Sequence, residues 1–170
     1  MNGWHKNKFA PMRLMLLTWL LFFNCVEAQD KLEVNAIDQT GTVVKIIDGD
    51  TFDLLTKEKK TIRVRMNGID CPERKQDFYT VSKNALADYI FKKEIKLLIT
   101  GRDRNKRTIA IVYYNGININ LAMIRNGYAW HYKKYSADTI FAEAEKKART
   151  RKKGLWQMNN PVPPWEFRAG

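Results

Sequence analysis

Residues 43–55 have the sequence VVKIIDGDTFDLL, in which two β-rich runs flank Asp48-Gly49-Asp50. An Asp-Gly pair tolerates the positive φ angles of a tight turn, so this stretch predicts a β-hairpin. Residues 61–66 alternate apolar side chains with polar ones and predict a third strand that has one apolar face. Three successive strands make β-structure the organising element of the chain.

Helices and strands alternate after this point. Apolar residues at helical spacing, Val81, Ala85 and Tyr89 with Leu86 and Ile90 beside them, predict an amphipathic helix over residues 80–92. The remaining predicted elements are strands at 95–100 and 108–114, a helix at 119–126, and a helix from Ser136 or Asp138 to before Gly154. Five short strands and three helices predict an α+β, mainly β fold, a small Greek-key barrel packed against the helices.

Charge and composition narrow the class of function. The chain has 170 residues with 30 Lys and Arg against 18 Asp and Glu, a formal net charge of +12. That length suits one domain, and the sign of the charge favours a polyanionic partner such as nucleic acid or an anionic membrane surface. Two cysteines and two histidines are too few for a disulfide scaffold, a four-cysteine zinc site or a histidine-built metal centre.

The first 28 residues have the layout of a secretory signal peptide. A basic start precedes an apolar run at residues 14–23, and the small-residue pattern Val26-Glu27-Ala28 follows. Cleavage after Ala28 leaves a flexible lead-in at 29–40 and a domain at 41–168, and predicts a secreted or periplasmic protein. A retained N-terminal anchor helix and a lipid on Cys25 are the alternatives, although the apolar run is short for a bilayer span.

Acidic and basic side chains suited to phosphodiester chemistry stand at turns and strand ends. Taken singly, each cluster is typical of a surface turn. If Asp50 and Asp70 converge, their oxygens suit a hard divalent cation such as Ca²⁺ or Mg²⁺. Glu73 then has the place of a general base, and the guanidinium groups of Arg65 and Arg107 match phosphate oxygens. The combination predicts a phosphodiesterase.

From about Gly41 to Trp165 the sequence resembles the staphylococcal nuclease family. Its motifs occur in order and at the family's spacing. The matching stretches are Ile47–Thr51, Arg65 with Gly68–Glu73, Asp103-Arg104 with Arg107, Asn120–Trp130, Gly154–Trp156 and Pro163–Glu166.

The resemblance implies an oligonucleotide-binding-type barrel and a Ca²⁺-dependent endonuclease that cleaves DNA and RNA, single-stranded or locally open, and leaves 3′-phosphate ends. It implies a monomer with no organic cofactor and no stable membrane association. Transferred by position, the roles are calcium ligands for Asp50, Asp70 and the Cys71 carbonyl, catalysis for Arg65, Glu73 and Arg107, and substrate binding for Arg104 and Tyr135.

Several positions depart from the family pattern. Asn105 and Lys106 replace an aromatic residue and a glycine, Gln76–Tyr79 replaces the common Gln-Pro-(Phe or Tyr)-Gly, and Lys133 replaces a tyrosine. We expect these changes to affect affinity and base preference more than the chemical step. A non-catalytic nucleic-acid-binding barrel and an envelope-anchored interaction module are the rival functions.

Three further polar residues have no predicted catalytic role. We expect His131 to be a packing histidine, Arg63 to be a solvated charge and Cys71 to carry a structural thiol.

Overall fold

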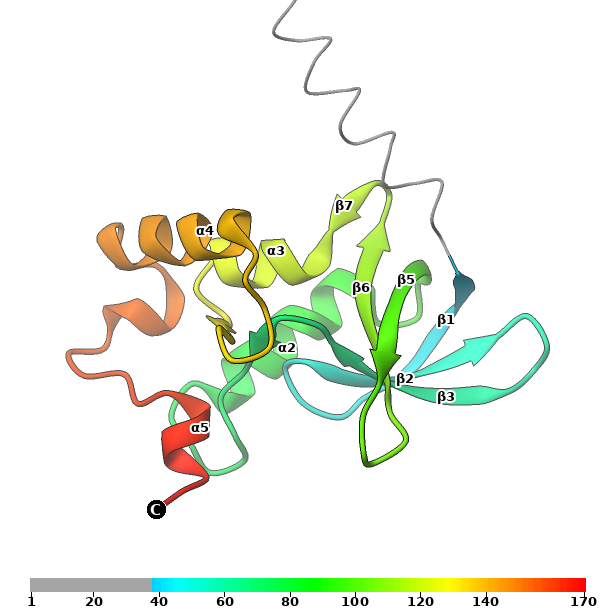
Figure 1. Cartoon of the computed structure of the whole chain (residues 1–170), viewed down its shortest axis with the longest axis horizontal. Helices are drawn as coiled ribbons and strands as arrows, with labels where there is room; N and C mark the ends of the chain where they lie inside the picture. The colour runs from blue at the N-terminus through cyan, green and yellow to red at the C-terminus, as the bar shows by residue number, and fades with distance from the viewer. Residues whose placement is uncertain (1–37) are drawn as a thin grey trace, which may run out of the picture. The chain divides into compact units, whose positions relative to one another are not determined.

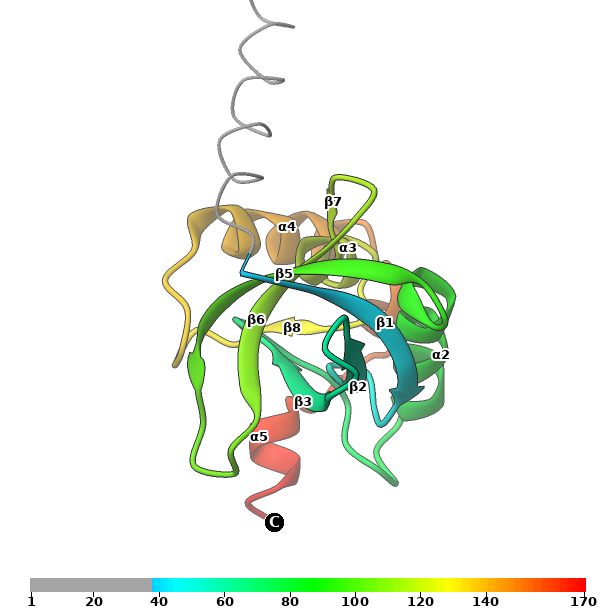
Figure 2. The ribbon, with the colours of Figure 1, turned by 90° about the vertical axis from the view of Figure 1, so that its right-hand side faces the viewer.

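Five strands close into a barrel in the computed structural model, which describes residues 38–170 (Figure 2). The predicted signal peptide and most of the predicted lead-in lie outside these residues. The barrel strands are β1 (Gln39–Ile46), β2 (Thr51–Thr56), β3 (Thr61–Met66), β5 (Glu94–Arg102) and β6 (Thr108–Tyr114). The sheet order is β3-β2-β1-β5-β6, and a parallel pairing of β3 with β6 closes the barrel. The predicted α+β barrel is therefore confirmed.

Two register shifts accompany the curvature of the barrel. One lies between Val43 and Lys45 in β1, and the other lies between Ile99 and Gly101 in β5. An extra residue at such a bulge bends its strand and increases the local twist. Apolar side chains such as Phe52, Leu54 and Val64 fill the interior and are fully buried.

The helices gather on one side of the strands (Figure 1). They are α2 (Tyr79–Ile90), α3 (Ile119–Arg125) and α4 (Thr139–Thr150). Asn118 and Asp138 cap α3 and α4 through their side-chain oxygens, in the manner of ordinary N-caps. Short pieces complete the fold: strands β4 (Ile69–Asp70), β7 (Ile117–Asn118) and β8 (Trp130–His131), the 3₁₀ helix η1 (Gly154–Gln157) and the terminal helix α5 (Pro164–Phe167). Within residues 38–170 no helix is long and apolar enough to cross a bilayer.

The buried face of α2 matches the predicted face except in its first turn. Val81 is 46% exposed, whereas Ser82 is fully buried beside Ala85 and Leu86. The Ser82 hydroxyl donates a hydrogen bond of 2.7 Å to the carbonyl of Tyr128, which satisfies this polar group in the core. Ala85, Leu86 and Ile90 are buried as predicted and Tyr89 packs against the core, but hydrophobic periodicity misses Ser82 because it scores serine as a surface residue.

The glycine of the first hairpin is needed for space rather than for backbone conformation. Gly49 does not adopt the positive φ that the Asp-Gly pair predicts. Instead, a Cβ atom there would collide with the Ser82 hydroxyl and lie 3.0 Å from the Cys71 sulfur. The close approach seats the loop after β1 directly against α2 and the segment after β4.

Candidate active site

Strand register brings Asp50 to Arg65. Thr51 in β2 lies opposite Arg65 in β3, so the residue before Thr51 reaches the Arg65 side chain. The Met66 amide donates to the Asp50 carbonyl at 2.8 Å and fixes the backbone there. The Asp50 carboxylate forms an ion pair with Arg65 Nη1.

Asp70 reaches the same guanidinium group after a tight reversal of the chain. Gly68 has a φ of 71°, which favours glycine, and the reversal leads into β4, where Asp70 pairs with Trp130 of β8. Arg65 Nη2 lies 2.7 Å from Asp70 Oδ1. Asp50 and Asp70 therefore converge on the two ends of one guanidinium group, which is the convergence that the sequence required.

Cys71 faces Asp50 through its main chain. Its amide donates to Asp50 Oδ2 at 2.8 Å. The Cys71 side chain is buried, and burial raises the pKa of its thiol far above the ordinary range, so the sulfur stays protonated. The thiol is unsuited to nucleophilic attack or metal ligation, and any contribution of Cys71 to a metal site falls to its main chain.

Glu73 has an unpredicted partner, Arg168, which directly follows α5. The Arg168 guanidinium contacts both oxygens of Asp70, at 3.3 Å from Nη1 to Oδ1 and 2.8 Å from Nη2 to Oδ2. Its Nη1 also forms an ion pair with the Glu73 carboxylate. Hydrogen bonding to Asp70 raises the pKa of Arg168, so the guanidinium stays charged. Its one signal in the sequence is its place two residues beyond Pro163–Glu166.

Arg107 is held by its own turn. Asp103 Oδ2 accepts from Arg107 Nε at 2.7 Å, and its Oδ1 accepts from the amides of Asn105 and Arg107 at 2.9 Å each. Within residues 38–170 Arg107 therefore pairs with Asp103 and not with the carboxylates at Arg65. The charge of Arg107 still acts on the loop that contains Asp48 and Asp50. Burial raises the pKa of Asp48, and the positive charges of Arg65 and Arg107 oppose this rise.

The same turn contains a lysine in a conformation that favours glycine. Lys106 has a φ of 62°. A residue with a Cβ atom pays about 1 kcal/mol in this left-handed region. The departure from the family pattern at position 106 thus falls where the backbone most favours a glycine.

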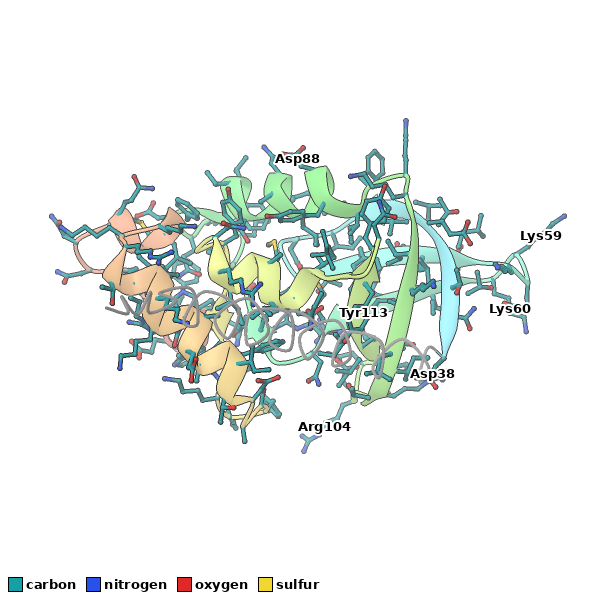
Figure 3. The ribbon with its side chains drawn as sticks, turned by 90° about the horizontal axis from the view of Figure 1, so that it is seen from above. Asp38, Lys59, Lys60, Asp88, Arg104 and Tyr113 are labelled. Atoms are coloured by element: carbon teal, nitrogen blue, oxygen red, sulfur yellow. The ribbon has the colours of Figure 1, made fainter. Side chains whose placement is uncertain are left out.

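The structure does not bring Arg104 or Tyr135 to the carboxylates. Arg104 is exposed on the β5–β6 turn, and its side chain extends away from the ribbon (Figure 3). Tyr135 is 65% exposed, and its ring packs edge-on against Tyr132 at 4.8 Å between centroids. Their predicted contacts with substrate stay predictions.

Three other polar residues form ordinary structural contacts. Arg63 is exposed, as expected of a solvated charge, and it also forms hydrogen bonds of 2.8 and 3.1 Å with Asp53 on the neighbouring strand. His131 is buried, and its ring lies edge-on to Phe141. Lys133, which replaces a tyrosine of the family, lies 3.5 Å from Glu145.

The oxygens of this cluster suit a hard cation. Asp50 from the loop before β2, and Asp70 and Glu73 from β4 and the loop after it, offer carboxylate oxygens, the ligands that Ca²⁺ and Mg²⁺ prefer. No three His, Cys, Asp or Glu side chains within residues 38–170 form a ready-made cage, and guanidinium groups lie on the carboxylate oxygens instead. The donor oxygens fit a divalent ion, which would supply the positive charge that guanidinium groups supply to these carboxylates here.

Comparison with known proteins agrees with the geometry. The family model described as "Staphylococcal nuclease homologue" matches residues 63–158. An "Uncharacterized endonuclease" of Haemophilus influenzae is 45% identical over 156 residues, which cover 92% of this chain and 85% of the relative. An "Uncharacterized endonuclease" of Escherichia coli O157:H7 is 33% identical over 95% of this chain and 97% of its own length. A "Micrococcal nuclease" of Shigella flexneri is 40% identical over 77% of this chain and 81% of its own length.

Proposed function

The chain belongs to the staphylococcal nuclease family and is a phosphodiester-cleaving hydrolase, and we propose that it is a Ca²⁺-dependent endonuclease that cleaves both DNA and RNA and leaves 3′-phosphate ends. The observation that carries the proposal is the convergence of Asp50 and Asp70 on Arg65, with Glu73 beside them. Asp50 and Asp70 are buried, and carboxylates gathered in this way are costly unless positive charge compensates them, which a bound cation would do as the guanidinium groups do here.

The protein's own groups divide the work of hydrolysis. Asp50, Asp70 and the main chain of Cys71 would hold the metal ion, which when bound orients the phosphate and withdraws negative charge from it. A carboxylate oxygen of Glu73 takes the proton of the attacking water, a role worth about 10²–10⁴-fold in rate. Arg65 and Arg107 donate hydrogen bonds to the non-bridging oxygens, where charge accumulates in the transition state.

The surface charge supports a polyanionic substrate. The second half of α4 and the residues after it are strongly basic, and the whole chain carries a formal net charge of +12. The basic residues there are Lys146, Lys147, Arg149, Arg151, Lys152 and Lys153. Positive charge of this density attracts a nucleic-acid backbone without selecting a base sequence.

A nicking assay tests the proposed activity. Supercoiled plasmid and a single-stranded RNA are incubated with purified protein in Ca²⁺, in Mg²⁺ or in chelator. We expect nicking and RNA cleavage in Ca²⁺, none in chelator, and 3′-phosphate ends that block polymerase extension until a phosphatase removes them. Cleavage that persists in chelator would contradict metal dependence, and 3′-hydroxyl ends would contradict the proposed bond.

We also propose that the protein is exported, secreted or periplasmic, and acts as a monomer without stable membrane association. The basic start, short apolar run and small residues up to Ala28 support export. The N-terminal sequence of the protein recovered outside the cytoplasm tests this proposal, with Gln29 expected as the first residue. An intact Met1 on the exported protein would contradict cleavage.

A further inference from the structure

We propose that residues 161–168 act as a C-terminal clasp: Arg168 occupies the carboxylates that the metal ion uses, and metal binding releases it. The proposal rests on the metal-dependent function above. In the metal-free enzyme the clasp is closed, and the Arg168 guanidinium takes the place of the metal ion. The C-terminal segment and the cation therefore compete for one site.

The competition follows from which oxygens Arg168 covers. Its two terminal nitrogens contact both oxygens of Asp70, and the same group pairs with Glu73. A divalent cation on Asp70 would stand within a few ångströms of this guanidinium, and like charges at that distance repel strongly in a partly buried site. The Arg168 guanidinium, which covers both oxygens of Asp70, and the cation therefore compete for this carboxylate.

Arg65 differs from Arg168 in reach and exposure. Of the two Asp70 oxygens, Arg65 contacts Oδ1 alone. The Arg65 side chain is 15% exposed. The Arg168 side chain is 40% exposed, so solvent already reaches it in the closed position. Of the two arginines, Arg168 is the one that a metal ion displaces.

Separate contacts hold the clasp in place. The ring of Trp165 stacks on Tyr132 at 5.3 Å with an interplanar angle of 2°, and it lies edge-on to Trp130. Gln76 donates to the Val162 carbonyl at 2.6 Å and accepts from the Glu73 amide at 2.8 Å. The clasp thus contacts the Glu73 loop twice, through Gln76 and through Arg168. These contacts, together with the Trp165 stacking, fix the position of the clasp over the site.

Release of the clasp needs little unfolding. The α5 helix has four residues, of which only Pro164 is buried. Short terminal elements with few buried contacts open at low free-energy cost. Movement of this segment leaves the barrel and its carboxylates intact.

Metal binding without nucleic acid tests the proposal directly. Ca²⁺ and Mg²⁺ are titrated separately into the purified wild-type protein, Arg168→Gln and Arg168→Lys by calorimetry. We expect Arg168→Gln to bind the metal about tenfold more tightly than wild type, because the competing charge-assisted hydrogen bonds are gone. Arg168→Lys, which keeps the charge but not the two-pronged contact, should lie between them. The control is Arg74→Gln, which removes an equal charge from an exposed residue next to Glu73 and should change affinity less than twofold.

Thermal unfolding separates the clasp from a merely structural role. Arg168→Gln should lower the Tm in chelator, and saturating metal should close most of that gap, because the wild-type clasp is already released there. A second signature is tryptophan emission: metal should change it in wild type, and the change should be small in Trp165→Phe.

Several outcomes would overturn the clasp. These are unchanged or weaker metal binding by Arg168→Gln, an equal loss of Tm with and without metal, or no metal binding by any variant. Nuclease activity is not part of these measurements. A protein that binds metal as described but fails to nick plasmid would therefore contradict the proposed function and leave the clasp standing.

Discussion

The carboxylate cluster at Arg65 and the β5–β6 turn at Arg107 are built in opposite ways. The first depends on pairings among β2, β3, β4 and β8 and joins residues that the fold alone brings together. The second is closed within five residues by Asp103 and Arg107. The side chain of Arg65 is 15% exposed and that of Arg107 is 30% exposed. The comparison shows that the carboxylate cluster is the fixed half of the site, because strand pairing in the core holds it. The β5–β6 turn is the adjustable half, because only local contacts hold Arg107.

Glu73→Gln should have the largest effect, because it removes the proposed proton acceptor of the attacking water from the carboxylate cluster. We expect kcat to fall by about 10²–10⁴-fold with little change in substrate affinity. Steady-state kinetics on a fluorogenic oligonucleotide measures both. The control is Asp77→Asn on the same loop, an exposed acid that should leave kcat within about twofold of wild type. Near-normal turnover of Glu73→Gln would remove this residue from the mechanism.

Arg65→Ala comes next and compares two arginines of one strand. We expect kcat to fall by about 10²–10³-fold, more than KM rises, because in the proposed mechanism Arg65 stabilises charge that develops in the transition state. Arg63→Ala is the control, since Arg63 pairs with Asp53 rather than with the cluster, and it should change kcat little. Arg65 would be a uniform binding residue if KM alone changed. Circular dichroism must first show that both variants are folded.

Asp103→Asn tests the adjustable half and should have a smaller effect. The asparagine side chain keeps an oxygen that accepts from the main-chain N–H groups of the turn. It loses the negative charge that orients Arg107. We expect kcat/KM to fall by about tenfold, the range for one charge-assisted hydrogen bond. A loss as large as that of Arg65→Ala would show that the turn is as critical as the cluster, and would break the comparison.

His131 should give the smallest effect, on stability rather than on catalysis. Burial lowers the pKa of His131 in the folded protein, while the charge of Glu145 opposes this shift. The unfolded chain therefore binds the proton more readily. The contribution of neutral His131 to the free energy of unfolding is therefore complete above the ordinary pKa of about 6.5, and it is lost as the pH falls through the lowered pKa of the folded protein. Urea unfolding between about pH 7.5 and 5 should show a shallower pH dependence for His131→Gln than for wild type. Equal slopes would contradict the assignment.

Local patterns in the sequence predict most of the barrel. The alternation at residues 61–66 and the loop at Asp48–Asp50 give the first three strands, and Gly127 marks the end of α3 with a φ of 70°. The one misplaced residue of α2, Val81, has a tertiary cause: Ser82 takes the buried position because its hydroxyl is satisfied by the Tyr128 carbonyl, which no local pattern shows. Gly49 is also explained only by its distant neighbours.

The site divides in the same way. Carboxylates and arginines in family motifs predict Asp50, Asp70, Arg65 and Glu73, and the structure brings these together. Arg168 escapes prediction because it contacts Asp70 across 98 positions of the chain and follows a four-residue helix that has no periodic signal. Residue type and spacing identify candidates, but partners so far apart in sequence emerge only from packing.

The metal dependence of cleavage by wild type, Asp50→Asn and Asp70→Asn tests the central claim most directly. The initial rate of plasmid nicking is measured as Ca²⁺ is raised from a chelated baseline. We predict a saturable rise for wild type and its loss in both variants, because the proposed site needs both Asp50, in the loop before β2, and Asp70, in β4, to hold one cation. A variant of either residue that keeps the wild-type rate and half-saturating Ca²⁺ concentration would contradict the claim.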